Sequence, residues 1–220
     1  MKPDYNIPEL KEICKMTNEN VKEFAECAAL AYKDYPLFKY LTKDDYNYKV
    51  IKNIIFASIK SMDTQMLGLS NNNDFTATVI LCPPGYTGSK VLPFLFNGGV
   101  KLFFMKSPLI FFRLMNYENH AMKIKKKYTN HDCWYLYNAT VKPKFQCKGE
   151  ISKLLNPIFK FLDRIGQDCY LETHKEENVK LYEHFGFELV ETSKIPKTDF
   201  VQYSMLRRAK MKGGEKNDKK

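Results

Sequence analysis

The stretch from Gln146 to Ser152, Gln-Cys-Lys-Gly-Glu-Ile-Ser, has the composition of a phosphate-binding loop. It follows an apolar run, Trp134 to Val141, that we expect to be a strand, and it leads into a strongly periodic helical segment. The first four N–H groups of a helix have no partner within the helix and lie at the positive end of its dipole, so they bind phosphate oxygens. Gly149 lets the backbone approach a ligand closely. The loop therefore predicts a phosphate cradle at a helix N-terminus.

The segments after the loop are expected to position it. Apolar residues at helical spacing predict a helix from Ile151 to Ile165, kinked at Pro157 and ended by Gly166. The following strand has to pair in parallel with the run before the loop, through a right-handed crossover. We expect this strand and the two that complete the sheet at Cys169–Thr173, Phe187–Glu191 and Phe200–Arg207.

The N-terminal half predicts a strand, two helices and an antiparallel hairpin. Thr17 or Asn18 can cap the first helix, and Asp34-Tyr35-Pro36 ends it, because a residue before proline avoids helical angles. Thr42 to Asp45 supplies cap residues for the second helix. The expected elements are Glu9–Met16, Val21–Tyr32, Tyr46–Ile59, and the hairpin Gln65–Leu69 with Phe75–Leu81.

Residues 83–130 form an insertion between the hairpin and the central strand, with two expected helices, Val91–Val100 and Lys101–Lys127. Lys101, Lys106 and Pro108 interrupt its apolar run, so it is not expected to span a membrane. The insertion can add core helices, and it can also act as a lid over an acceptor pocket. The candidate lid residues are aromatic: Phe94, Phe96, Phe103, Phe104, Phe111 and Phe112.

Composition is that of a globular chain, with 220 residues, 44% hydrophobic residues and a net charge of +10. We expect a single domain over residues 1–208 and a disordered basic tail over 209–220. The charge is concentrated from Arg207 to Lys220 and in the lysines between 123 and 127, without the interleaved aromatic residues typical of nucleic-acid binding. We therefore expect no nucleic-acid partner and no membrane partner.

The six cysteines include no Cys-x-x-Cys pair, and no paired histidines lie near them. A structural zinc site is not expected. The N-terminus has no segment of signal-peptide type, so reduced, buried thiols in a cytoplasmic protein are the expectation. Cys147 differs from the others because it lies in the candidate phosphate loop beside Lys148, a setting that could lower a thiol pKa.

Two motifs resemble the GNAT superfamily of acetyl-CoA-dependent N-acetyltransferases. The run from Tyr135 to Val141, with Gln146-x-x-Gly149 after it, resembles the acyl-CoA pyrophosphate loop, although Ile151 replaces the usual Gly or Ala. The second motif is Asn178-x-x-x-Tyr182-x-x-x-Gly186-Phe187. The resemblance implies an α+β fold, an α/β/α sandwich whose mixed central sheet has splayed central strands and flanking helices, with the extra helical insertion.

The resemblance also implies where acetyl-CoA binds and which residue acts as acid. The pantetheine arm would bond to the backbone around Thr140 and Val141, and Asn178 could bond the same arm. Tyr182 would protonate the departing thiolate. No metal is implied. The predicted pyrophosphate-binding residues are Gln146, Cys147, Lys148, Gly149, Glu150, Ile151 and Ser152.

The general base is not fixed by the motifs. Some family members carry a glutamate on the central strand, where this sequence has Tyr135. The candidates here are His131, Glu172 and His120, and water could carry the proton instead. The implied reaction is acetyl transfer to a primary amine of a small molecule or peptide by a monomer or homodimer. The alternatives are a non-catalytic acyl-CoA-binding regulator, which Ile151 would favour, and a nucleic-acid-binding protein that uses the lysine clusters.

Overall fold

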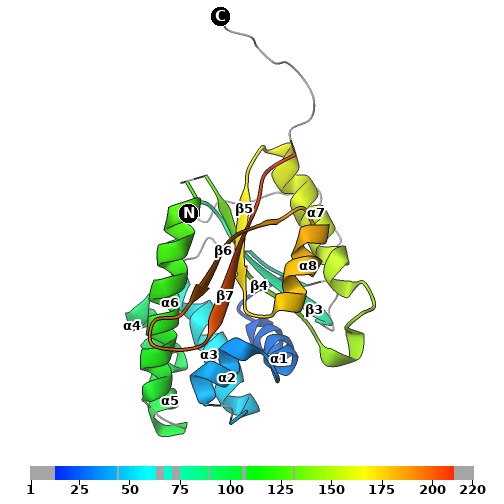
Figure 1. Cartoon of the computed structure of the whole chain (residues 1–220). Coiled ribbons are helices and arrows are strands. Elements are labelled where there is room, and N and C mark those ends of the chain that lie inside the picture. The colour runs from blue at the N-terminus through cyan, green and yellow to red at the C-terminus, as the bar shows by residue number, and fades with distance from the viewer. Residues whose placement is uncertain are drawn as a thin grey trace, which may run out of the picture.

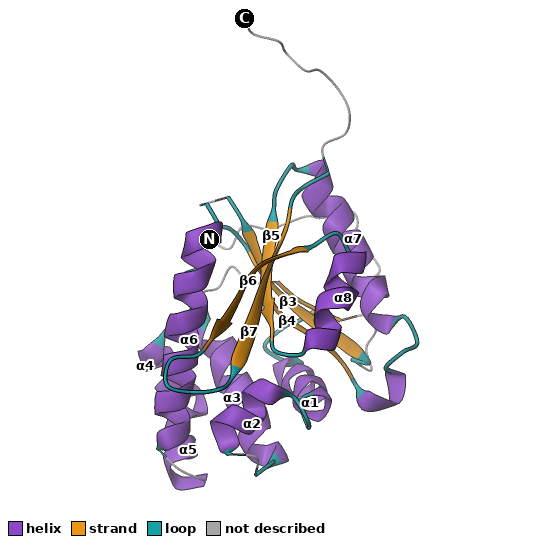
Figure 2. Ribbon diagram, in the orientation of Figure 1, coloured by secondary structure: helices purple, strands orange, loops and turns teal. Residues whose placement is uncertain are grey.

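The computed structural model describes residues 13–43, 45–62, 67–70, 75–88, 90–105, 108–130 and 132–210. The start of the predicted strand at Glu9, the candidate base His131 and the tail beyond Lys210 lie outside these residues. The described residues form one seven-stranded mixed sheet in the order β1-β2-β3-β4-β5-β7-β6. Helices cover both of its faces (Figures 1 and 2). This is the α/β/α sandwich that the sequence motifs predicted.

Two antiparallel groups of strands meet at a single parallel pair in the middle of the sheet. Strands β1 to β4 pair antiparallel with their neighbours in turn, and β7 lies between β5 and β6, antiparallel to both. The predicted hairpin is therefore confirmed as β2 and β3. The strands are β1 (Cys14–Lys15), β2 (Leu67–Ser70), β3 (Ala77–Cys82), β4 (Trp134–Val141), β5 (Cys169–Thr173), β6 (Glu188–Lys194) and β7 (Val201–Arg207).

The parallel strands β4 and β5 separate soon after they meet. They pair only at Trp134 with Cys169 and at Tyr135 with Tyr170, although β4 continues to Val141 and β5 to Thr173. The predicted parallel pairing and the predicted splay of the central strands are both confirmed. A wedge-shaped space therefore opens between the two strands at their C-terminal ends.

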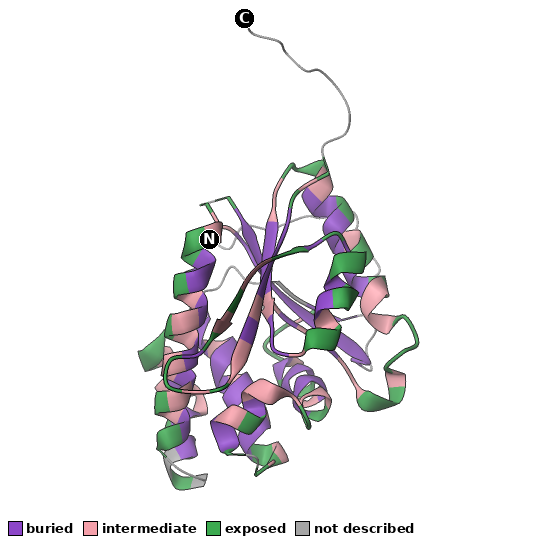
Figure 3. Cartoon of the chain, viewed as in Figure 1, coloured by how far each residue is buried: buried purple, intermediate pink, exposed green. Residues whose placement is uncertain are grey.

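Helices α7 (Glu150–Arg164) and α8 (Glu176–His184) cover one face of the sheet. Apolar residues of α7, including Leu154, Ile158 and Leu162, pack on β3 and β4 and are fully buried. Figure 3 shows the alternation of buried and exposed turns along this helix. Gly166 ends it with φ 67°, and the amides of Gly166 and Gln167 bond back to Asp163 and Leu162, as in a Schellman motif.

Helices α1 (Val21–Ala31), α2 (Pro36–Thr42) and α3 (Tyr48–Ser61) pack against the opposite face, and α1 and α3 correspond to the two predicted N-terminal helices. Two capping predictions were wrong. The residue before α1 is Asn20, and α3 is capped by Asn47, whose side chain accepts from the Val50 amide at 3.2 Å. Helix α2 was missed, because Pro36 was interpreted only as a helix end. Proline is equally favourable in the first turn of a helix, which is its position in α2.

The insertion forms α4 (Val91–Phe94), the π-helical turn η2 (Leu95–Gly99), α5 (Val100–Met105) and the long helix α6 (Leu109–Tyr128). Phe94 is buried and Phe111 packs against the same core, whereas Phe96, Phe104 and Phe112 are exposed. The side chain of Phe103 lies outside the described part. Of the described phenylalanine side chains in this set, two thus belong to the core and three lie on the surface. Helix α6 contributes Leu114, Tyr117 and Glu118 to a cavity over the sheet.

Helix length and the placement of potential metal-ligating side chains are two further properties of the described residues. No helix in the described ranges is both long enough and apolar enough to cross a membrane. The same residues contain no group of histidine, cysteine, aspartate and glutamate side chains that could hold a metal ion. Four of the cysteines are buried as predicted, but Cys14 is half-buried and Cys147 is exposed.

Candidate active site

The predicted phosphate loop lies between β4 and α7, where the chain turns at the short 3-10 helix η3 (Pro143–Phe145). Cys147 and Gly149 both have left-handed backbone angles, with φ 60° and 75°. A Cβ atom at Gly149 would meet nothing within 4 Å, so the backbone angle, and not space, favours glycine there. Left-handed residues at alternate positions turn successive N–H groups toward the same side, which is the geometry of an anion-binding nest.

Several amides of this loop are available to a ligand. The N–H groups of Cys147, Lys148, Gly149 and Ile151 make no hydrogen bond to any other described residue. The Ser152 amide differs, because it donates to the Gly149 carbonyl at 3.1 Å. A row of unpartnered amides therefore lies at the N-terminus of a 15-residue helix.

The side chains of the loop hold its shape. Gln146 donates from Nε2 to the Val141 carbonyl at 3.2 Å and so ties the loop to the end of β4. Glu150 accepts from the Thr76 hydroxyl at 2.8 Å and pairs with Lys153. Ile151 packs against the apolar layer beneath α7. The one predicted loop residue that departs from the family pattern thus contacts the core through its side chain.

The space between the splayed strands is a small cavity of about 60 Å³, which we call the splay chamber. Two of its lining residues, Asn178 and Tyr182, were predicted as site residues, and a third, Glu172, as a candidate base. The predicted backbone positions Thr140 and Val141 lie further along β4, beyond the residues that line the chamber. The lining residues are Tyr32, Tyr35, Leu37, Tyr117, Leu136, Tyr137, Asn138, Ala139, Glu172, His174, Asn178 and Tyr182.

A β-bulge in β4 determines which side chains line this chamber. Ile80 of β3 pairs with Asn138, but the next residue, Leu81, pairs with Leu136, so Tyr137 is an extra residue. An extra residue reverses the alternation of side chains along a strand. Tyr137 and Asn138 therefore both point toward the α1–α3 side, and the Asn138 amide donates to the Tyr32 hydroxyl at 2.7 Å.

Glu172 on β5 is the carboxylate of the chamber. Its Oε1 accepts hydrogen bonds from the hydroxyls of Tyr135 and Tyr117, the second at 3.1 Å. Its Oε2 is shielded from solvent and has no partner among the described residues. Burial raises the pKa of Glu172 from its ordinary 4.5 to about 7, against the lowering effect of the Tyr135 hydrogen bond. This carboxyl can therefore exchange a proton near neutral pH.

A chain of hydrogen bonds lines the wall opposite β4. The Tyr35 hydroxyl bonds Thr173 Oγ1 at 3.2 Å, and Asn178 Nδ2 donates to the same oxygen at 3.0 Å. His174 contacts Tyr35 twice, through its backbone amide and through Nδ1. Burial lowers the pKa of His174 to about 3, so its ring is neutral. These bonds fix Asn178 and His174 at the chamber.

Tyr182 lies on α8, and its buried ring packs edge-on against Phe187. Its hydroxyl makes no hydrogen bond to the rest of the described chain, and the residue lines the chamber. Burial raises the pKa of Tyr182 above its ordinary value, with a further contribution from Tyr35. The hydroxyl therefore stays protonated at neutral pH and is able to donate.

The other candidate bases are placed elsewhere. His120 on α6 contacts Ser193 of β6 through Nε2 at 2.9 Å and does not line the chamber. His131 is not among the described residues. Tyr135, at the position of the glutamate in some GNAT proteins, donates to Glu172 instead of acting as a base. Of the two candidates that the structure describes, Glu172 lines the chamber and His120 does not.

Sequence reasoning missed Asn138, His174 and Tyr117 as site residues. Asn138 faces the chamber only because of the bulge, and no turn-forming residue in this part of the sequence predicts a bulge. Tyr117 lies in the insertion, whose path over the sheet depends on tertiary packing. His174 directly follows the predicted strand Cys169–Thr173 and precedes the second motif, so its place at a strand end was the one available signal.

The sheet order, the splay and the glycine loop match the fold that the two sequence motifs predicted. Among solved structures, the C-terminal condensation domain of Ebony in complex with beta-alanyl-dopamine has a TM-score of 0.62 at 10% identity, covering 90% of this chain and 98% of that one. A structure from Corynebacterium glutamicum, described as histone acetyltransferase HPA2 and related acetyltransferase, has a TM-score of 0.59 at 14% identity. The match covers 91% of this chain and 97% of that one. At such identities the likeness shows the fold alone, and it is the fold that the GNAT resemblance implied.

Sequence comparison links part of the chain to a curated protein. An uncharacterised N-acetyltransferase of Schizosaccharomyces pombe is 46% identical over 54 residues, which are 24% of this chain and 22% of that relative. The match thus spans less than a quarter of the relative's length. No protein-family model matches the chain.

Proposed function

We propose that this chain transfers an acetyl group from acetyl-CoA to an amine nitrogen. One observation carries the proposal: the unpartnered amides at the start of α7 lie at the end of the same strand, β4, whose separation from β5 opens the splay chamber. A ligand with a diphosphate at one end and an extended arm at the other fits this arrangement. The N-acetyltransferase relative and the fold support the same reading.

The chain's own residues fit the diphosphate and the arm of the cofactor. The amides of Cys147, Lys148, Gly149 and Ile151 would hold the diphosphate, with the exposed Lys148 side chain beside them. The edge of β4 that β5 leaves unpaired, near Thr140 and Val141, would hold the arm. When bound, acetyl-CoA supplies an activated acetyl thioester.

Two side chains of the chamber can manage the protons. Glu172 Oε2 would take a proton from the bound ammonium and so free the nitrogen lone pair to attack the acetyl carbon. As the carbon–sulfur bond breaks, Tyr182 would give its hydroxyl proton to the sulfur and recover a proton from the nitrogen of the new amide. The products are the acetylated amine and free coenzyme A, and proton exchange with solvent restores Glu172. The pKa of Glu172, raised by burial to about 7, suits a base at neutral pH.

Calorimetry with acetyl-CoA, followed by a thiol-release assay over a panel of amines, tests the proposal. We expect binding with one site per chain and thiol release that depends on an added amine. No binding of acetyl-CoA would refute the proposed function.

The same pair of measurements separates the enzyme from a non-catalytic regulator of the same fold. Ile151 suggested the regulator from sequence, but the Ile151 side chain packs on the core beneath α7 and Glu172 provides a base. Tight binding of acetyl-CoA without turnover of any amine would favour the regulator.

A further inference from the structure

Resting on the proposed function, we propose that the acceptor is a small primary amine with one positive charge and a compact apolar body. The ammonium group would bind in the splay chamber, and the body would fill an adjoining apolar cavity. Two independent features carry this inference, namely the hydrogen-bonding character of the chamber and the lining of the cavity beside it.

The chamber offers unpartnered acceptors on several of its walls. Glu172 Oε2, Asn138 Oδ1 and His174 Nε2 are each shielded from solvent and have no hydrogen-bond partner among the described residues. All three residues line the chamber. Buried polar atoms without partners are rare in folded proteins, so three around one small cavity indicate a bound group that satisfies them.

The Tyr35 hydroxyl lies between His174 and Thr173, and with the ring proton on Nδ1 the Nε2 atom of His174 is an acceptor. The Tyr35 hydroxyl accepts from the His174 backbone amide and can donate its own proton to Thr173 Oγ1. Nδ1 of His174, which is 3.3 Å from the same hydroxyl, then carries the ring proton and donates it. Because burial keeps the ring neutral, Nε2 retains its lone pair. This assignment leaves Nε2 as an unpartnered acceptor on a residue that lines the chamber.

Three acceptors match the three N–H groups of a primary ammonium ion. A hydroxyl group would satisfy only one of them, and an N-methylated amine would leave one without a partner. A buried acceptor left without a donor costs affinity, so the chamber should select for primary amines over alcohols and secondary amines. The Glu172 carboxylate also provides the negative charge that the ammonium needs.

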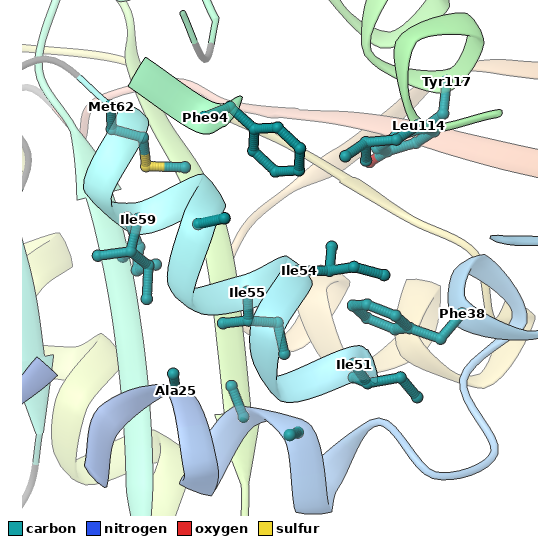
Figure 4. Close-up of a cluster of buried hydrophobic side chains, with 14 of the residues drawn as sticks. Ala25, Phe38, Ile51, Ile54, Ile55, Ile59, Met62, Phe94, Leu114 and Tyr117 are labelled. Atoms are coloured by element: carbon teal, nitrogen blue, oxygen red, sulfur yellow. The ribbon is translucent and has the colours of Figure 1, made fainter. Parts of the chain in front are cut away.

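The adjoining cavity, of about 60 Å³, shares Tyr32, Leu37, Tyr117, Tyr137 and Asn138 with the splay chamber. Most of its other walls are apolar and come from three helices. Figure 4 shows Phe38 of α2, Ile54 of α3 and Leu114 of α6 converging on one region. The remaining lining residues are Leu41, Ile55, Ser58, Ile59, Ile80 and Glu118.

This lining disfavours acceptors with a polar or extended body. Glu118 is the one acidic residue of the cavity, and its Oε1 accepts from the Tyr137 hydroxyl at 2.9 Å. A peptide would have to place backbone amides against leucine and isoleucine side chains, which offer them no hydrogen bonds. A compact alkyl or aryl group matches the walls.

The test compares kcat/KM values for a panel of amines in the thiol-release assay, after calorimetry has established acetyl-CoA binding. We expect phenethylamine or isopentylamine to exceed both putrescine and the peptide alanyl-glycyl-glycine by at least about 30-fold. N-methylphenethylamine should be at least tenfold poorer than phenethylamine, and phenethyl alcohol should not react. The inference would be overturned if the enzyme preferred putrescine or the peptide. It would also be overturned if acetyl-CoA bound but no apolar amine were acetylated. In either case the proposed binding of acetyl-CoA would still stand.

A matched pair of variants tests the cavity itself. Leu114→Ala should raise the ratio of kcat/KM for naphthylethylamine over phenethylamine about tenfold, because it removes side-chain volume from the cavity wall. Leu92→Ala makes the same change at an exposed position outside the cavity and should leave the ratio unaltered. A ratio within one variant does not depend on the folded fraction. An unchanged ratio in Leu114→Ala would contradict the placement of the acceptor's body, and absence of acetyl-CoA binding would overturn the proposed function as well.

Discussion

Glu172→Gln should lower kcat/KM by about 10²- to 10⁴-fold, the range over which a general base contributes. The change keeps Oε1, which accepts from Tyr135 and Tyr117, and replaces only the unpartnered Oε2 by an amide nitrogen. In the wild type, kcat/KM should rise with pH through an apparent pKa near 7 as Glu172 loses its proton. This rise of kcat/KM with pH should disappear in the variant. Stopped assays from pH 5.5 to 8.5 would measure the pH dependence of both proteins.

Glu172→Gln should raise the stability of the folded protein, although it lowers activity. The folded protein holds the pKa of Glu172 at about 7, against an ordinary value of 4.5. As pH rises, the unfolded chain therefore loses this proton first, and wild-type stability falls between these two values. Glutamine does not titrate, so the variant should match the wild type near pH 4 and exceed it above pH 7. At 1.36 kcal/mol per pKa unit, the variant's free energy of unfolding should exceed that of the wild type by at most about 3 kcal/mol.

Glu118→Gln is the matched control. Glu118 is also bonded by a tyrosine, and burial also raises its pKa to about 7. Its glutamine variant should gain stability over the same pH window and yet retain the rise of kcat/KM with pH. Activity of Glu172→Gln within threefold of the wild type, or loss of this rise in Glu118→Gln instead, would refute the assignment of Glu172 as the base.

Tyr182→Phe should lower kcat by about 10- to 100-fold. The Kd for acetyl-CoA, measured by calorimetry, should change less than twofold. Equal losses in kcat and in cofactor affinity would mean that the ring has only a structural role. Gly149→Asp should weaken acetyl-CoA binding at least about 30-fold by placing a carboxylate at the amide cradle, and retained affinity would contradict that cradle. Asp163→Ala should cost about 3–5 kcal/mol in urea unfolding, since Arg207 is buried and donates to both Asp163 oxygens at 2.7 Å. The comparison is Asp199→Ala, whose exposed pair with Lys194 should contribute less than about 1 kcal/mol.

The sequence predicted the parts of this fold that local patterning determines. The apolar spacing after Gly149 and the glycine at 166 defined α7 within a residue or two of its observed ends. The strand–helix–strand order required β4 and β5 to be parallel, and they are. These features depend on helical periodicity, left-handed glycines and the handedness of crossovers, all of which can be read from neighbouring residues.

The missed features depend on contacts between distant segments. Pro36 can either end a helix or start one, and only the packing of Phe38 and Leu41 into the core shows that it starts α2. The bulge at Tyr137 follows from pairing with β3, more than fifty residues away in the chain. Without the bulge, Asn138 would be predicted on the α7 face, so no strand pattern could place it in the chamber.

The position of the proposed base, Glu172, follows from the geometry of the splayed pair. Tyr135 pairs with Tyr170, and Glu172 is two residues further along β5, so all three side chains lie on the same face of the sheet. The strands separate directly after this pair, which leaves Glu172 on the edge of the splay chamber with Tyr135 donating to it. A carboxylate on β5 thus lies one strand away from the β4 position used by some GNAT proteins and two residues further along. Because both strands border the same wedge, a base on either of them can reach it.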